Sequence, residues 1–84
     1  MIQPSQITGD KIKTARIMAG YSQKEFAAAV EMTTNAIRNI ETGKRRPHPK
    51  NFERIINALR ARGIVFEEYN ESFVIYKLDL KEKQ

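Results

Sequence analysis

Cysteine and tryptophan are absent from this 84-residue chain, and histidine occurs once. Without cysteine the chain forms no disulfide and offers no thiolate to a metal ion. Its apolar runs are only a few residues long, far below the roughly 20 residues that span a bilayer. The N-terminus also lacks the basic-then-apolar pattern of a signal peptide. We therefore expect a cytoplasmic protein that neither crosses nor binds a membrane.

Residue patterns that support catalysis are equally scarce. The single histidine, His48, lies between two prolines. A solvated position, or one beside a phosphate, is a simpler interpretation of it than a catalytic base or a metal ligand. No paired carboxylates, metal-ligand cluster or phosphate-binding glycine loop occurs in the sequence. We therefore predict that the protein is not an enzyme, has no catalytic residue, and needs no metal or cofactor.

Positive charge is concentrated in the first three quarters of the chain. Residues 1–63 hold 12 Lys and Arg against 5 Asp and Glu, a net charge of +7, whereas residues 64–84 hold 3 against 5, a net charge of −2. A basic domain of this kind is suited to contact phosphate groups. The alternative is that scattered cationic side chains only keep a small domain soluble. The length allows one domain with a modest core.

Helix-starting signals divide the basic part into four segments. Ser22 and Glu25 have the spacing of a capping box, in which each side chain bonds a free backbone N–H group. Thr8 and Thr33 are further N-cap residues, and Pro49 suits the first turn of a helix. Apolar residues recur at helical spacing after each of these positions. The sequence thus predicts four helices, each ended by a glycine or a turn.

The last part of the chain has a different periodicity. Residues 64–69 and 73–80 are rich in aromatic and β-branched residues, which predicts a hairpin or two extended segments. One apolar face of the second segment consists of Val74, Tyr76, Leu78 and Leu80. Because isolated hairpins are only marginally stable, this face needs a partner. We expect it to form a homodimer; the alternative is that it covers Phe52, Ile56 and Leu59 within one monomer.

Residues 21–27 read Tyr-Ser-Gln-Lys-Glu-Phe-Ala, and residues 36–47 read Ala-Ile-Arg-Asn-Ile-Glu-Thr-Gly-Lys-Arg-Arg-Pro. These segments resemble the Cro/CI-type (Xre) helix-turn-helix regulators. Arg16 and residues 55–59 also fall where that family has them, so the resemblance covers about residues 9–63. It implies a mainly α fold, a lambda-repressor-like helix-turn-helix bundle of four or five short helices with a C-terminal β-hairpin or strand. We divide the chain into a DNA-binding domain (1–63) and a β extension for dimerisation (64–84).

The resemblance also implies a function. In the family the second helix of the motif enters the major groove and reads base edges. We expect a bacterial or phage-encoded transcriptional regulator, a repressor, that binds palindromic double-stranded DNA as a homodimer. The positions that match base-contacting residues are Thr33, Thr34, Asn35, Arg38 and Asn39. Those that match phosphate-contacting residues are Ser22, Gln23, Thr42, Lys44, Arg45 and Arg46. Arg16 and Glu41 match a partly buried ion pair.

One position departs from the family pattern, and a second function stays open. Glu31 stands in the turn between the two helices of the motif, where the family usually has glycine because the backbone is left-handed. The alternative function is an antitoxin-like module that binds a partner protein and represses its own operon. The tail distinguishes the two functions, because a tail that pairs with itself favours the homodimeric regulator.

Overall fold

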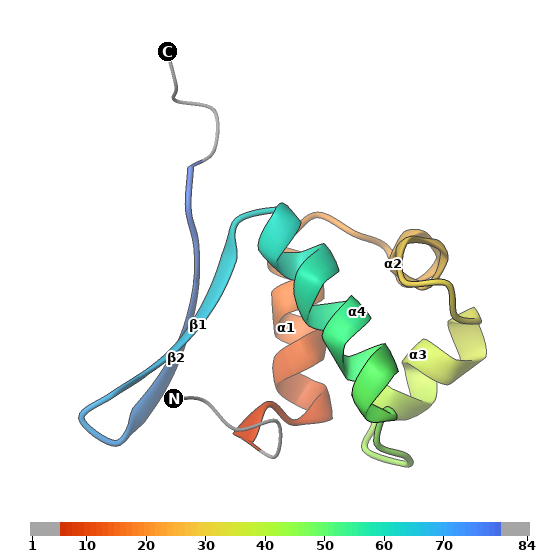
Figure 1. Ribbon diagram of the computed structural model, residues 1–84, viewed down its shortest axis with the longest axis horizontal. Helices are drawn as coiled ribbons and strands as arrows, with labels where there is room; N and C mark the ends of the chain where they lie inside the picture. The colour runs from red at the N-terminus through yellow and green to blue at the C-terminus, as the bar shows by residue number, and fades with distance from the viewer. Residues whose placement is uncertain (1–5, 80–84) are drawn as a thin grey trace.

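The computed structural model describes residues 6–79. Four helices come first, α1 (Gly9–Met18), α2 (Gln23–Ala29), α3 (Thr34–Glu41) and α4 (Pro49–Ala61), followed by the strands β1 (Ile64–Tyr69) and β2 (Ser72–Lys77). In Figure 1, α2 and α3 lie at one end of the molecule and the two-stranded sheet at the other. This arrangement confirms the predicted mainly α bundle with a C-terminal β-hairpin. None of the helices described is long and apolar enough to cross a membrane.

Apolar side chains from all four helices and the start of β1 form the core. The largest fully buried ones are Phe26, Ile12, Ile37, Ile40, Ile55, Leu59, Ile64 and Val30. Three alanines are also buried, Ala15 on α1, Ala19 at its C-cap and Ala27 on α2. α3 packs against both α1 and α2, and its position is therefore determined by contacts on two sides.

The helix starts follow the local sequence with one exception. The Ser22 hydroxyl accepts the backbone N–H of Glu25 at 3.0 Å, and the Glu25 carboxylate accepts that of Ser22 at 2.9 Å, which completes the capping box. Thr33 caps α3 by accepting the N–H of Ala36 at 3.0 Å. Thr8 occupies the N-cap position of α1, but its hydroxyl donates to the carboxylate of Asp10 instead. The prediction that the Thr8 side chain caps a backbone N–H group of α1 is therefore wrong.

The turn between α2 and α3 contains a left-handed residue other than glycine. Glu31 has a φ of 60°, in the region where a β-carbon costs about 1–2 kcal/mol. Its carboxylate lies 3.6 Å from the guanidinium of Arg54, and both side chains are exposed, so this ion pair contributes little stability. The departure from glycine noted in the sequence therefore carries a conformational cost that no strong contact offsets.

Replacing Glu31 with glycine should raise the free energy of unfolding by about 0.5–1 kcal/mol, because relief of the left-handed strain exceeds the added entropy of the unfolded chain. Urea unfolding of both proteins measures the difference. The matched control is Glu53→Gly, which makes the same change on the exposed side of α4 and should cost about 1 kcal/mol. A Glu31→Gly protein that is destabilised as much as Glu53→Gly would contradict the strain at this turn.

The hairpin packs its inner face on the helices. β1 and β2 pair antiparallel through a turn at Asn70 and Glu71, which both have positive φ as a two-residue hairpin turn requires. The side chains of Phe66, Phe73 and Ile75 are half-buried against the core, with the rings of Phe66 and Phe73 6.1 Å apart. β1 packs on α4 and β2 on α1, and the hairpin therefore covers part of the helical core.

The outer face of the hairpin remains exposed. Val74, Tyr76 and Leu78 are 38%, 38% and 49% exposed. The alternative in which this face covers the α4 side chains within one monomer is therefore wrong, because the buried Ile64 at the start of β1 and the alternation of side chains turn Phe66 and its cross-strand partner Ile75 inward. Leu80, the fourth predicted member of the face, lies outside the described residues.

Candidate nucleic-acid interface

Helix α3 is amphipathic, with a buried side that positions its polar side. Ile37, Ile40 and Glu41 are buried, and this anchors the helix against α1 and α2. The residues predicted to contact bases begin at the N-terminal end of the helix. Of these, Thr33, Asn35 and Arg38 are exposed, whereas Thr34 and Asn39 are half-buried. The structure thus brings the five predicted residues together on one short helix and its cap.

Two of these side chains form a hydrogen bond with each other. The guanidinium of Arg38 donates to the amide oxygen of Asn35 at 3.0 Å, one helical turn away. Asn35 and Arg38 are both exposed and, three positions apart, lie on the same side of the helix, where the Asn35 NH₂ and the other Arg38 N–H groups are further donors. Hydrogen-bond donors of this kind can reach the acceptors on the edges of adenine and guanine. The helix therefore offers a compact set of polar groups of the type that reads bases.

The cationic loop follows directly at the other end of α3. The backbone N–H groups of Lys44 and Arg45 donate to the carbonyl of Asn39 at 2.9 and 3.3 Å, so the start of the loop folds back on the helix. Gly43, with a φ of 82°, makes this reversal possible. Lys44, Arg45 and Arg46 are all exposed. Three cations therefore lie in sequence beside the C-terminal end of α3.

The remaining predicted phosphate-contacting residues lie at helix ends. Thr42 caps the C-terminus of α3, and its hydroxyl donates to the carbonyl of Arg38 at 3.0 Å. Ser22 is exposed at the start of α2, where its hydroxyl serves the capping box. Gln23, the first residue of α2, is half-buried. All three residues thus have local structural contacts in addition to any role toward a ligand.

A buried ionic network connects the two helices of the motif to α1. Arg16 Nε lies 2.7 Å from Glu41 Oε2, and Arg16 Nη2 donates to Glu41 Oε1 at 3.2 Å. The amide of Gln23 donates to the same Glu41 Oε1 at 3.1 Å, a contact that nothing in the local sequence indicated, because the two residues are 18 positions apart. This network holds the start of α2 beside the end of α3, and so positions the phosphate-contacting candidates relative to the helix.

The chemistry of this surface is that of a polyanion site. Exposed guanidinium and ammonium groups border a helix face of amide and hydroxyl groups, and among residues 6–79 no cluster of three or more His, Asp and Glu side chains could hold a metal ion. Cations that neutralise phosphates position a protein on DNA, and polar side chains that reach base edges provide selectivity. The arrangement of α3 and the following loop fits both requirements.

Comparison with known families gives one match. Residues 12–63, more than half of the chain, match the model of a family described as Helix-turn-helix. The matched segment includes α2, α3, the cationic loop and α4. No curated protein matches the chain.

Proposed function

This chain belongs to the Cro/CI-type (Xre) helix-turn-helix family, and from this premise we propose that it is a sequence-specific regulator of transcription that binds double-stranded DNA as a homodimer and represses the genes beside its operator. The match supports DNA binding and transcription regulation in general. The observation that carries the more specific proposal is the exposed polar side of α3 bordered by three consecutive cations. The proposal assigns no catalytic residue, metal or cofactor.

In the proposed complex, the N-terminal end of α3 enters the major groove. Asn35 and Asn39 would bond adenine through their amides, and Arg38 would bond guanine. Thr33 and Thr34 would offer hydroxyl or methyl groups to neighbouring bases. Asn35 and Arg38 already bond each other, so part of the entropy lost on ordering these side chains is lost before DNA binds. This supports the selection of these two residues as the central pair of the base-reading set.

Phosphates would be bound on both sides of the groove. Lys44, Arg45 and Arg46 provide cations after α3, and Thr42 lies beside them. Ser22 and Gln23 lie at the start of α2, where Glu25 offsets the helix dipole, so their side chains would make the phosphate contacts. Because Gln23 contacts Glu41, the two phosphate-contacting groups are connected by the buried network.

Loss of a base-contacting side chain and loss of a phosphate-contacting side chain should affect DNA binding in different ways. Asn35→Ala or Asn39→Ala should weaken binding to the preferred duplex by about 1–3 kcal/mol and relax the choice of base at one position. Arg45→Ala should weaken binding to all duplexes alike and reduce the slope of log affinity against log salt by about one. Titrations on a selected and a scrambled duplex at several salt concentrations measure both effects.

Lys13→Ala is the control for loss of charge, because Lys13 is an exposed cation on α1 outside the proposed interface. It should change neither the base preference nor the salt slope by a comparable amount. If Arg45→Ala alters base preference while both asparagine variants leave it unchanged, the proposed orientation of α3 in the groove is wrong.

The proposed homodimer uses the outer face of the hairpin. One helix-turn-helix reads only a few base pairs, whereas two copies on a two-fold axis read half-sites about one helical turn apart. Val74, Tyr76 and Leu78 are exposed and apolar, which supports this face as the contact. The Tyr76 hydroxyl donates to Glu67 at 3.1 Å, and desolvation together with this bond raises the pKa of Tyr76. The phenol therefore stays neutral, and its hydroxyl bonds the carboxylate of Glu67 on the same face.

The variant Val74→Lys/Leu78→Lys should be monomeric in analytical ultracentrifugation and bind a two-half-site operator on the order of 10²-fold more weakly than the wild type. Lys at position 74 would face Glu67 across the strands, so the hairpin should stay folded. Deletion of β2 would be less informative, because Phe73 and Ile75 belong to the core packing.

Ile17→Lys is the matched control, since Ile17 is an exposed large apolar residue on α1 rather than on the hairpin. It should remain dimeric. A double-lysine variant that is still dimeric would assign the interface to the helices. A wild type that is monomeric at high concentration would favour the antitoxin-like alternative, in which the same exposed face binds another protein.

A further inference from the structure

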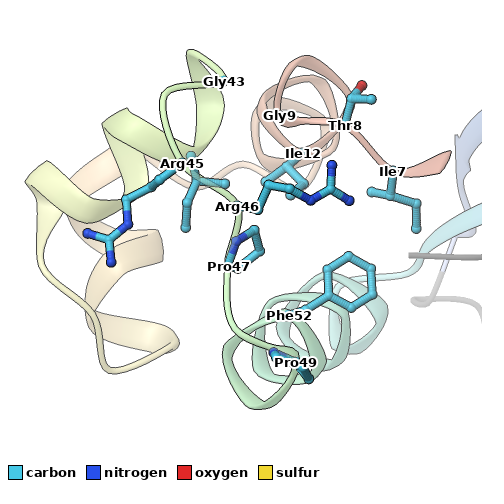
Figure 2. A pocket seen from close by; sticks show the side chains of 11 residues that line it. Ile7, Thr8, Gly9, Ile12, Gly43, Arg45, Arg46, Pro47, Pro49 and Phe52 are labelled. Atoms are coloured by element: carbon cyan, nitrogen blue, oxygen red, sulfur yellow. The ribbon is translucent and has the colours of Figure 1, made fainter. Parts of the chain in front are cut away.

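A cavity of about 360 Å³ lies between the start of α1, the loop after α3 and the start of α4. Figure 2 shows its lining, with Ile7 and Ile12 on the α1 side and Phe52 on the α4 side. Ile40 and Pro47 complete the apolar part. The volume falls within the range of sites that bind small molecules, and the proposed contacts of α3 with bases make no use of it.

The cavity has a cation at its edge. Arg45 and Arg46 both line the cavity. In Figure 2 the guanidinium of Arg46 extends over the space between Ile12 and Ile7, whereas that of Arg45 points the other way. Arg46 is exposed and has no hydrogen bond or ion pair within residues 6–79. A guanidinium that no residue of this described range bonds is well suited to a planar carboxylate, which it can bond with two parallel hydrogen bonds.

The helix ends at the cavity add to the preference for an anion. Pro49, the first residue of α4, lines the cavity, and α4 has no acidic residue in its first turn. The positive end of its helix dipole is therefore not compensated by a carboxylate of the same helix. Thr8 and Gly9 bring the start of α1 to the same place, although Asp10 offsets the dipole of that helix. An anionic group is favoured over a neutral or cationic one.

The apolar lining continues beyond this cavity. A second hollow of about 190 Å³ shares Ile7 and Phe52 with the first and extends to Ile56, Ile64, Val65 and Phe66, with Arg60 as the one charged residue of its lining. A ligand with its charge at Arg46 therefore has apolar surface available along α4 toward β1. This length favours a flexible hydrocarbon chain over a compact polar molecule.

We propose that the cavity binds a medium-chain monocarboxylate, with the carboxylate on Arg46 and the hydrocarbon chain between Ile7, Phe52 and Ile56. Such binding withdraws Arg46 from phosphate and lowers DNA affinity, which makes the carboxylate an inducer of a repressor. This second step rests on the proposed function, because it requires Arg46 to contact DNA. The first step, binding of the carboxylate, does not.

Calorimetric titration of the DNA-free, full-length protein with octanoate tests the first step. Octanoate should bind the wild type, and octanamide, which has the same chain without the charge, should bind about tenfold more weakly or worse. Arg46→Gln should lose octanoate affinity to a similar extent. Arg45→Gln removes the neighbouring charge, which points away from the cavity, and should bind octanoate as the wild type does.

Two results would overturn the assignment of the cavity. One is no heat from octanoate at millimolar concentration, and the other is equal affinity for octanoate and octanamide. Circular dichroism of Arg46→Gln verifies that the loss of affinity is not a loss of fold.

The second step is tested by titrating the operator duplex with and without saturating octanoate. Octanoate should weaken DNA binding of the wild type and of Arg45→Gln, and should leave Arg46→Gln unaffected. DNA affinity that stays unchanged in octanoate-saturated wild type would overturn the inducer role. A protein that binds octanoate but no DNA in the absence of ligand would contradict the proposed function and leave the carboxylate site supported.

Discussion

Replacing Arg16 with alanine should lower the free energy of unfolding by about 3–5 kcal/mol. The guanidinium bonds both carboxylate oxygens of Glu41 and also donates to the carbonyl of Tyr21 at 2.9 Å. The side chains of Arg16 and Glu41 are only 9% and 2% exposed. Removing the cation would leave a buried carboxylate that, of its side-chain partners in residues 6–79, retains the amide of Gln23. The large cost follows from this uncompensated charge, not from the strength of the ion pair itself.

Thermal and urea unfolding of Arg16→Ala and Lys13→Ala measure this effect. Lys13 lies on the same helix and is exposed, and its loss should cost within about 0.5 kcal/mol. The double variant Arg16→Met/Glu41→Leu removes both charges and should recover much of the stability, because no buried charge remains. Equal melting temperatures for Arg16→Ala and Lys13→Ala would show that the pair is solvated in solution.

Replacing Gly9 with alanine should lower the free energy of unfolding by roughly 3 kcal/mol, although alanine is ordinarily the better residue in a helix. A β-carbon at this position would lie 2.0 Å from the carbonyl oxygen of Ile40 and 3.0 Å from that of Glu41. Both are backbone atoms, so no side-chain rotation can relieve the clash. The start of α1 would have to move away from the end of α3, which opens the core at Ile12 and Ile40.

Gly43→Ala is the matched control for the glycine substitution. A β-carbon there has no atom within 4 Å, and only its φ of 82° is unfavourable. That strain alone should cost about 1–2 kcal/mol, and Gly9→Ala should therefore lower the melting temperature more. A Gly9→Ala protein as stable as the wild type would show that α1 and α3 are not in backbone contact.

Local sequence was sufficient to predict where the helices of the motif begin. The capping box of Ser22 and Glu25 and the cap of Thr33 depend on residues three positions apart, and both form as their spacing predicts. The left-handed backbone at Glu31 was indicated by the family resemblance instead, because the family has glycine at this turn position. Thr8 has the same side chain as Thr33, yet its hydroxyl donates to the carboxylate of Asp10 and accepts no backbone N–H of α1.

The faces of the hairpin could not be assigned from local sequence. Both faces of β2 are apolar, with Phe73 and Ile75 on one and Val74 and Tyr76 on the other. The alternation of side chains alone therefore does not indicate which face of β2 packs on the helices. The face with Val74 and Tyr76 continues further along the chain as an apolar series, yet it is the exposed one. The inward face is determined by Ile64, which is buried just after α4. Its burial determines which side of β1 faces the core and, through the register, which side of β2 does.

The sequence by itself thus determined the features that depend on neighbours along the chain: the helix starts, the turns, the polar side of α3 and the family to which the chain belongs. Only the tertiary structure decided the features that join distant positions. These are the backbone approach of Gly9 to Ile40, the bond from Gln23 to Glu41, and the cavity below Arg46. The physical reason is that such contacts depend on the angles at which helices pack, and those angles result from the fit of all core side chains together.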